Sequence, residues 1–367
     1  MLAGETLNVV DASGRVIVSN TGAGNLLAGE IRNQSLVVQS NQEVRGAVSS
    51  TTSLTLGGDT GGVVTAVTQA QGNVLAATTD SASLALTATQ RASGDVIARS
   101  DIANSGARLT SGGALSAVAQ GNALAAGGAD STIAGSIDQT TTGEIRAHSL
   151  GAIQYAPAPL NLAAQAHANV AQAVTTGTST QNLTIRQQSS GGMVEAASNP
   201  SAGNGWNLSA RSAAIGNQAT AYNEGGRQQV AVAQSNDATI RGAARGFGYD
   251  FGESRISADA SANQAAVHGA GNELTLDNSQ INSGGVSAIA TFDGARGYDV
   301  YTGANATGNV VIGGCADCGG FSGANVQTNS GAVSAQSTTN ISIQGRHVIS
   351  GTTAVGNSAT FTATGGR

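Results

Sequence analysis

Short runs of alternating apolar and small or polar residues recur along the whole chain, separated by Gly, Ser, Asn and Asp. VTQAQGNVLAATTD (residues 67–80) is one such stretch, and SAVAQGNALAAGGAD (residues 116–130) nearly repeats it 49 residues later. Alternation with a period of two residues predicts β-strands, and the small polar residues between the runs predict tight turns. No run has the periodicity of a capped amphipathic helix. We therefore expect an all-β protein.

Two columns of amide residues run through these repeats. The first is an asparagine that returns every 46 to 49 residues, at Asn25, Asn73, Asn122, Asn169, Asn217, Asn263, Asn309 and Asn357. The second follows the first seven asparagines by 17 or 18 residues, at Gln42, Gln90, Gln139, Gln187, Gln234, Gln280 and Gln327. Two registers held over the whole chain indicate a structural repeat rather than low complexity.

Short strands and turns at a fixed long period predict a solenoid, in which each coil buries its inner face on the next. We expect one right-handed parallel β-solenoid (β-helix) over residues 1–367, with about seven repeats of about 47 residues. This period is about twice a common coil length, which favours two coils per repeat and a rod of about 70 Å. A single large coil per repeat would halve that length.

The amide columns have a structural role in this prediction. Stacked amides can hydrogen-bond along the axis of a parallel β-structure and hold its register. With two coils per repeat, identical amides would be too far apart to touch, and the intervening coil would have to supply their partners. The inward positions carry Val, Ile, Leu and Ala, which predicts a thin core.

Composition narrows the function classes. The chain has 52 Gly, three Pro and 10% charged residues, a combination that argues against a disordered chain of high charge. Its net charge is −6, and all 16 basic residues are Arg without a basic block, so a nucleic-acid partner is not expected. No apolar stretch approaches the about 20 residues of a membrane-spanning helix, and no signal peptide is visible.

Candidate redox and metal chemistry is sparse. Cys315 and Cys318 in GGCADCGG are consistent with a disulfide that closes a turn, a pair of free structural thiols, or half a metal site, in that order of preference. The four histidines share no repeat position and no metal-ligand spacing. We therefore predict no cofactor and no metal site.

Aromatic residues divide the rod into two parts. Residues 1–154 contain none and are expected to form a plain rod, whereas residues 155–367 contain all eleven and are expected to form a rod with aromatic-bearing loops. ARGFGYDF (residues 244–251) and ARGYDV (residues 295–300) resemble each other closely. Aromatic rings beside Arg and Asp suit carbohydrate or protein recognition, while the simpler alternative is that these loops cover the thin core. The predicted patch consists of Tyr155, Trp206, Arg245, Phe247, Tyr249, Asp250, Phe251, Arg296, Tyr298, Asp299 and Tyr301.

Two other function classes are alternatives to a structural adhesin. A polysaccharide-degrading β-helix enzyme needs a carboxylate cluster on adjacent coils, but Asp and Glu are few and scattered here. An ice- or surface-binding solenoid needs a regular Thr-x-Thr face, and the Thr pairs of this chain drift in register. We therefore expect a non-enzymatic role with no catalytic residues.

The repeat phrases VAQGNALAA and QTTTGEIRAHS, in an acidic chain without lysine, resemble extracellular curlin-like and filamentous-haemagglutinin-like proteins. Within that set the chain most resembles the holdfast-anchor (HfaD) family of stalked alphaproteobacteria. The resemblance implies an exported cell-surface protein that ties an adhesive polysaccharide to the outer membrane. It also implies a curlin-like subunit and an outer-membrane secretion pore as partners. Because the chain stops in mid-repeat and shows no capping helix, we expect a partner subunit or end-to-end self-association to close at least one end of the rod.

Overall fold

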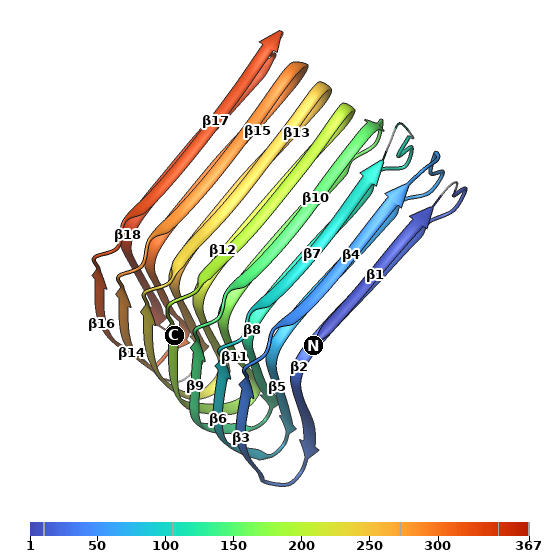
Figure 1. Ribbon diagram of the computed structural model, residues 1–367. Coiled ribbons are helices and arrows are strands. Elements are labelled where there is room, and N and C mark those ends of the chain that lie inside the picture. The colour runs from blue at the N-terminus through green and yellow to red at the C-terminus, as the bar shows by residue number, and fades with distance from the viewer. Residues whose placement is uncertain (10–11, 105, 107, 272, 344, 366–367) are drawn as a thin grey trace.

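The computed structural model describes residues 1–9, 12–104, 106, 108–271, 273–343 and 345–365. In these residues the regular elements are eighteen strands that pair in parallel and wind into stacked coils (Figure 1). The predicted all-β parallel solenoid is therefore confirmed. Each coil has three faces, which we call A, B and C in chain order. The coils stack from β1 at one end of the rod to β17 at the other (Figure 1).

The strands of each face follow one another along the axis. Face A contains β1 (Leu2–Val9), β4 (Val48–Leu56), β7 (Val96–Asn104), β10 (Ile145–Ala156), the first parts of β12 (Met193–Asn236), β13 (Thr239–Ala270) and β15 (Val286–Cys318), and β17 (Val333–Ile343). Face B contains β2 (Val16–Arg32), β5 (Val64–Asp80), β8 (Gly113–Ala129), the first part of β11 (Leu160–Ser189), later parts of β12, β13 and β15, and β18 (His347–Gly365). Face C contains β3 (Leu36–Val44), β6 (Ser83–Ala92), β9 (Thr132–Thr141), the ends of β11 and β12, β14 (Glu273–Asn282) and β16 (Gly320–Asn329).

Each repeat forms one coil, so the expectation of two coils per repeat is wrong. Strand β5 lies between β2 and β8, and Asn73 is in register with Asn25 on one side and Asn122 on the other. The same register continues to Asn357. Seven steps at the usual strand spacing of about 4.8 Å make a stack about 34 Å high, half the expected length.

The coil is long because it encloses two cores. In β5, alternate residues from Val64 to Gly72 are buried, and Asn73 is then buried directly after Gly72, which shifts the alternation by one residue. Val64 belongs to the larger core, whose residues come from faces A and B. Leu75, after the shift, belongs to the smaller core between faces B and C. A coil around two cores needs about twice the residues of a coil around one.

The asparagine column lies at the waist between these cores. Each Nδ2 donates to the Oδ1 of the asparagine in the next coil at 2.7–2.8 Å. The same Nδ2 reaches across the waist to a backbone carbonyl at the end of face C, as Asn217 does to Ser235 at 2.9 Å. Identical amides therefore touch directly, contrary to the expectation of an intervening coil.

The glutamine column runs beside it with the opposite polarity. Each Nε2 donates to the Oε1 of the glutamine in the preceding coil at 2.7–2.8 Å. It also donates to a face B carbonyl of the next coil, as Gln187 does to Gln218 at 2.8 Å. A third ladder joins Asn236, Asn282 and Asn329, two residues after the glutamines. Sequence reasoning missed this ladder because only the later repeats carry it.

The corner between faces B and C uses left-handed backbone in several coils. Non-glycine residues take positive φ there, among them Ser81 (φ 51°), Asp130 (φ 48°) and Asp317 (φ 54°). Asp317 lies between Cys315 and Cys318, which form a disulfide with their Cα atoms 5.8 Å apart. Of the three alternatives for the cysteine pair, the structure therefore has the disulfide. The described residues also form no helix long and apolar enough to span a bilayer.

Candidate functional site

The corner between faces A and B carries an aromatic residue in four successive coils: Tyr155, Trp206, Phe251 and Tyr298. Tyr155 lies at the end of β10, and the other three lie where β12, β13 and β15 pass from face A to face B. These segments are continuous strand rather than the loops that the sequence suggested. The four aromatic residues do not share one repeat position: Tyr155 is in register with Asn204, and Phe251 is in register with Gly205 and Gly297. They come together because these adjacent positions all lie at the same corner of the stacked coils.

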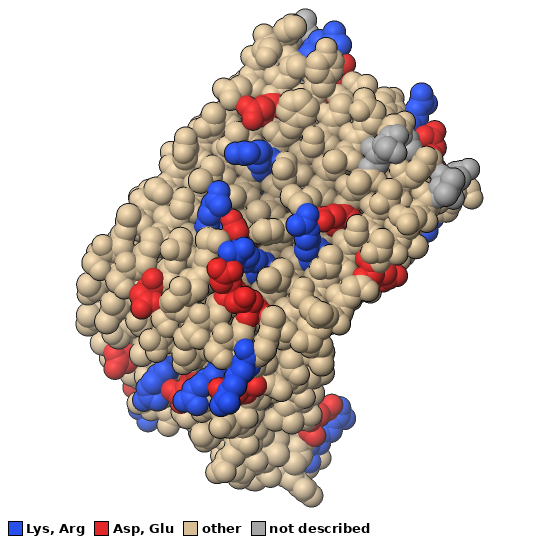
Figure 2. Space-filling model, in the orientation of Figure 1, with Lys and Arg blue, Asp and Glu red and all other residues tan. Residues whose placement is uncertain are grey.

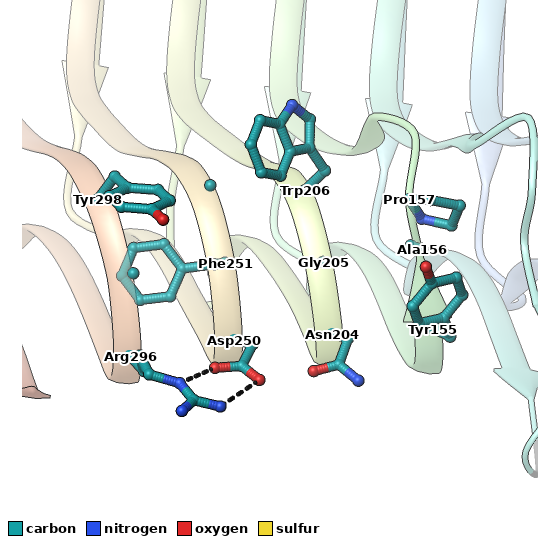
Figure 3. A pocket seen from close by; sticks show the side chains of 12 residues that line it. Tyr155, Ala156, Pro157, Asn204, Gly205, Trp206, Asp250, Phe251, Arg296 and Tyr298 are labelled. Atoms are coloured by element: carbon teal, nitrogen blue, oxygen red, sulfur yellow. Dashed lines mark hydrogen bonds and ion pairs between the residues drawn. The ribbon is translucent and has the colours of Figure 1, made fainter.

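A pocket of about 410 Å³ opens at this corner (Figure 3). The rings of Tyr155, Trp206 and Tyr298 stand around it, and the Phe251 ring reaches it from the core (Figure 3). Its lining residues come from four coils: Tyr155, Ala156, Pro157, Asn204, Gly205, Trp206, Asp250, Phe251, Gly252, Arg296, Gly297 and Tyr298. A concave site with aromatic walls and a few polar groups is typical of small-ligand and sugar-ring binding.

Glycines make room for the rings. A Cβ at Gly252 would lie 2.9 Å from Cδ2 of Trp206, so the indole ring can lie over this backbone only because the residue has no side chain. A Cβ at Gly297 would lie 2.4 Å from two carbons of the Phe251 ring. Phe251 itself is 5% exposed and packs edge-to-face on Phe292, with the ring centroids 4.8 Å apart. It is therefore mainly a core residue that also forms part of the pocket wall.

One ion pair supplies the charged groups of the pocket. Arg296 donates from Nε to Oδ1 of Asp250 at 2.5 Å and from Nη2 to Oδ2 at 2.9 Å (Figure 3). The Arg296 guanidinium lowers the pKa of the Asp250 carboxyl below its usual value, so this group stays ionised at neutral pH. Bidentate Arg–carboxylate pairs have a fixed geometry, which makes this pair a rigid part of the pocket.

Arginines cover one face of each tyrosine at the two ends of the pocket. The Arg108 guanidinium lies 5.1 Å from the Tyr155 ring centroid, and Arg108 belongs to the preceding coil. Arg346, in the coil that follows, lies 5.8 Å from the Tyr298 ring centroid. Cation–π contacts of this kind hold exposed rings in place. Each tyrosine is thus backed by an arginine from outside the pocket's four coils.

The structure places the remaining residues of the predicted patch elsewhere. Phe247 and Tyr249 are 43% and 56% exposed on the outer surface of face A, beside exposed Arg245. Tyr301 lies under Arg255, whose guanidinium is 5.0 Å from the ring centroid. The predicted patch is therefore divided among the corner pocket, the outer surface of face A and the start of face B.

Asp299 makes its contacts with two residues of the following coil. It accepts hydrogen bonds from Arg346 and lies 3.0 Å from Nδ1 of His347. The Arg346 hydrogen bonds, followed by that of His347, lower the pKa of the Asp299 carboxyl to about 2. Asp299 is therefore a charged group that ties the last coil to its neighbour.

Sequence reasoning missed several residues of the site. Asn204 pairs in register with Tyr155 and Asp250, and the repeat spacing could have identified it. Gly252 was not recognisable as a pocket residue, because its role depends on where the Trp206 ring turns. Arg108 and Arg346 lie one coil beyond the aromatic residues that they cover, and only the coil register connects them.

No group of three or more potential metal ligands occurs among the residues that the structure describes. The charged residues that are visible in Figure 2 form mixed clusters of both signs rather than a patch of one sign. Residues 10–285 match the family of holdfast attachment protein D.

The chain belongs to the holdfast attachment protein D family. Membership gives it a holdfast-related adhesion or anchor role at the cell envelope, of a structural kind. The matched region includes Tyr155, Trp206 and Asp250, whereas Arg296 and Tyr298 lie after it. No curated protein and no solved structure matches the chain.

Proposed function

We propose that this chain is a non-enzymatic anchor on the cell surface that ties an adhesive polysaccharide, the holdfast, to the outer membrane. The observation that carries the proposal is the corner pocket, where three exposed or half-exposed aromatic rings surround a rigid polar pair. Aromatic faces cover the C–H faces of sugar rings, and fixed polar groups bond their hydroxyls. Membership of the family supports the link to the holdfast.

The solenoid supplies the mechanical part of the proposal. Parallel strands on three faces join neighbouring coils through backbone hydrogen bonds, and the two amide ladders add buried side-chain bonds in most coils. A load across the rod would have to break many of these bonds together, which makes such a stack stiff. Because the pocket spans successive coils, a force applied to a bound polysaccharide would be distributed over several of them.

The pocket's chemistry favours binding over hydrolysis. Its lining residues include one carboxylate, Asp250, and that carboxylate is bonded to Arg296. Retaining and inverting glycosidases use two carboxyl groups about 5 to 9.5 Å apart, one of which must be able to carry a proton. The lowered pKa of Asp250 works against a role as general acid.

Partner proteins form a further part of the proposal. Val348 continues the inward column of Leu208 and Val300, yet it is 52% exposed in the coil of β18. We propose that a curlin-like subunit, an outer-membrane secretion pore or another copy of this chain contacts the exposed coil edges. Apolar inward positions on an uncovered edge favour such contacts.

A pull-down tests the anchor function. The purified chain is incubated with holdfast polysaccharide and envelope fractions, and the same mixture is assayed for new reducing ends. Retention of polysaccharide without new reducing ends supports the anchor, and retained envelope proteins identify the partners. New reducing ends would replace the proposal with the polysaccharide-degrading enzyme, and retention of proteins without polysaccharide would refute polysaccharide binding by the pocket.

Paired variants connect the result to the pocket. Trp206→Ala with Tyr298→Ala removes two rings from the pocket, and we expect at least tenfold weaker polysaccharide binding. Phe247→Ala with Tyr249→Ala removes two similarly exposed rings from face A and should leave binding intact. Equal loss in both double variants would show that exposed aromatic surface in general, and not the pocket, binds the polysaccharide.

A further inference from the structure

Tyr155 and Tyr298 lie at the two ends of the pocket along the rod axis (Figure 3). Arg108 approaches Tyr155 from the preceding coil, and Arg346 approaches Tyr298 from the following coil. Both arginines therefore contact the rings from outside the four coils that form the pocket. Tyr155 and Tyr298 are three coil steps apart, which is about 14 Å at the usual strand spacing. We expect a short segment of a sugar chain to lie along the axis between them.

The charges of the residues that line the pocket cancel. Among the described residues that line the pocket, the charged ones are Asp250 and Arg296, and two hydrogen bonds join them. Behind the tyrosines, Arg346 is paired with Asp299, whereas the guanidinium of Arg108 lies over the Tyr155 ring and is not among the groups that line the pocket. A charged sugar in the pocket would lose water without gaining an unpaired counter-charge from the residues that line it.

We propose that the Asp250–Arg296 pair determines ligand charge, so that the pocket accepts uncharged sugar units and rejects acidic and amino sugars. This inference rests on the proposed polysaccharide-binding function. The bonds to Asp250 use Nε and Nη2 of Arg296, which leaves Nη1 to donate to a sugar hydroxyl. The Asp250 oxygens keep lone pairs that accept from hydroxyl groups. The pair therefore offers both a donor and an acceptor without net charge.

Single substitutions of the pair leave one charge uncompensated. Asp250→Asn frees the Arg296 cation, and Arg296→Gln frees the Asp250 carboxylate. The two side chains are 36% and 56% exposed, so either replacement is expected to leave the fold intact. At a partly exposed site, one unpaired charge a few ångströms from a sugar charge is expected to change affinity by about five- to tenfold.

The experiment measures binding of three hexasaccharides by titration calorimetry: N-acetylglucosamine (uncharged), glucosamine (one amine per ring) and galacturonate (one carboxylate per ring). Wild type should prefer the uncharged hexamer. Asp250→Asn should gain affinity for the galacturonate hexamer, and Arg296→Gln should gain affinity for the glucosamine hexamer. The double variant, with neither charge, should return to the preference for the uncharged hexamer.

A second ion pair provides the matched control. Asp138 and Arg186 lie 3.5 Å apart on face C, with side chains 39% and 60% exposed. Asp138→Asn and Arg186→Gln make the same changes in net charge, and we expect them to leave selectivity unaltered. If they shift selectivity as the pocket variants do, the overall charge of the chain is responsible and the proposal is wrong.

The failure of this inference is distinguishable from failure of the proposed function. Wild type that binds the uncharged hexamer, together with pocket variants of unchanged selectivity, would overturn the role of the pair alone. A wild-type preference for a charged hexamer would do the same. Wild type that binds none of the hexamers, and no holdfast polysaccharide in the pull-down, would overturn both.

Discussion

The asparagine ladder makes a sharp prediction, because the same residue occurs both buried in the stack and at its edge. Asn217 is fully buried. Its Nδ2 donates to Asn263 at 2.8 Å and to the Ser235 carbonyl at 2.9 Å, and its Oδ1 accepts from Asn169 at 2.8 Å. Asn217→Ala removes all three bonds at once and leaves three buried groups without these partners.

The expected cost follows from that count. A buried polar group that loses its partner costs about 1–3 kcal/mol, so three such groups predict a loss of about 3–9 kcal/mol. The lower half of this range is expected, because Nδ2 of Asn169 keeps its bond to the Gln188 carbonyl. Asn25 makes bonds of the same kind, to Asn73 at 2.8 Å and to the Glu43 carbonyl at 3.0 Å, but it lies at the edge of the ladder. Water can replace the lost partners there, so Asn25→Ala should cost only about 0.5–1.5 kcal/mol.

Guanidinium chloride unfolding followed by far-ultraviolet circular dichroism measures both free energies. Hydrogen exchange then locates the loss, which should be concentrated in the coils of β11, β12 and β13 for Asn217→Ala. If the two variants lose the same stability, burial of the ladder does not determine its contribution. A loss in unfolding free energy below about 1.5 kcal/mol for Asn217→Ala would refute the reasoning, because three buried groups that each lose a hydrogen-bond partner should destabilise the fold by more than this.

Three further predictions concern the C-terminal coils. Gly297→Ala should displace the Phe251 ring, because a new Cβ would lie 2.4 Å from it. Binding to the pocket should weaken and the melting temperature should fall, and an unchanged melting temperature would contradict this packing. The pKa of Asp299, near 2 in the fold, lies below its usual 3.8, so its stabilisation is complete above about pH 4 and is lost as the pH falls toward 2. Arg346→Gln should flatten this part of the pH–stability curve, and a curve with the wild-type slope would exclude the pair as its cause. Reduction of the disulfide should cost about 2 kcal/mol, as expected for a short closed loop, and exchange mass spectrometry should show faster exchange near β16; unchanged exchange there would indicate that the turn is held by other bonds.

The regular spacing of the sequence repeats predicted most of the fold. Period-two alternation and the fixed spacing of Asn217 and its equivalents indicated parallel coils with amides at matching positions, and these features are local or strictly periodic. The number of coils per repeat was misjudged because it depends on where the alternation changes phase. Gly72 and Asn73 show that change in the buried pattern, but the letters alone do not reveal that a second core follows it.

The candidate site was likewise only partly predictable from the sequence. The sequence by itself determined that the aromatic residues all follow residue 154 and that several of them lie beside Arg and Asp. The similarity of ARGFGYDF and ARGYDV aligns Arg245 with Arg296, whereas the strand register of the structure places Asp250 beside Arg296. Only the tertiary structure decided that Phe251 turns into the core, that Phe247 and Tyr249 face outward, and that Tyr155, Trp206 and Tyr298 surround one pocket. The physical reason is that the chain changes direction at the corner between faces A and B. There the strict alternation of side chains fails, and the direction of each ring is set by the space that the glycines of neighbouring coils leave open.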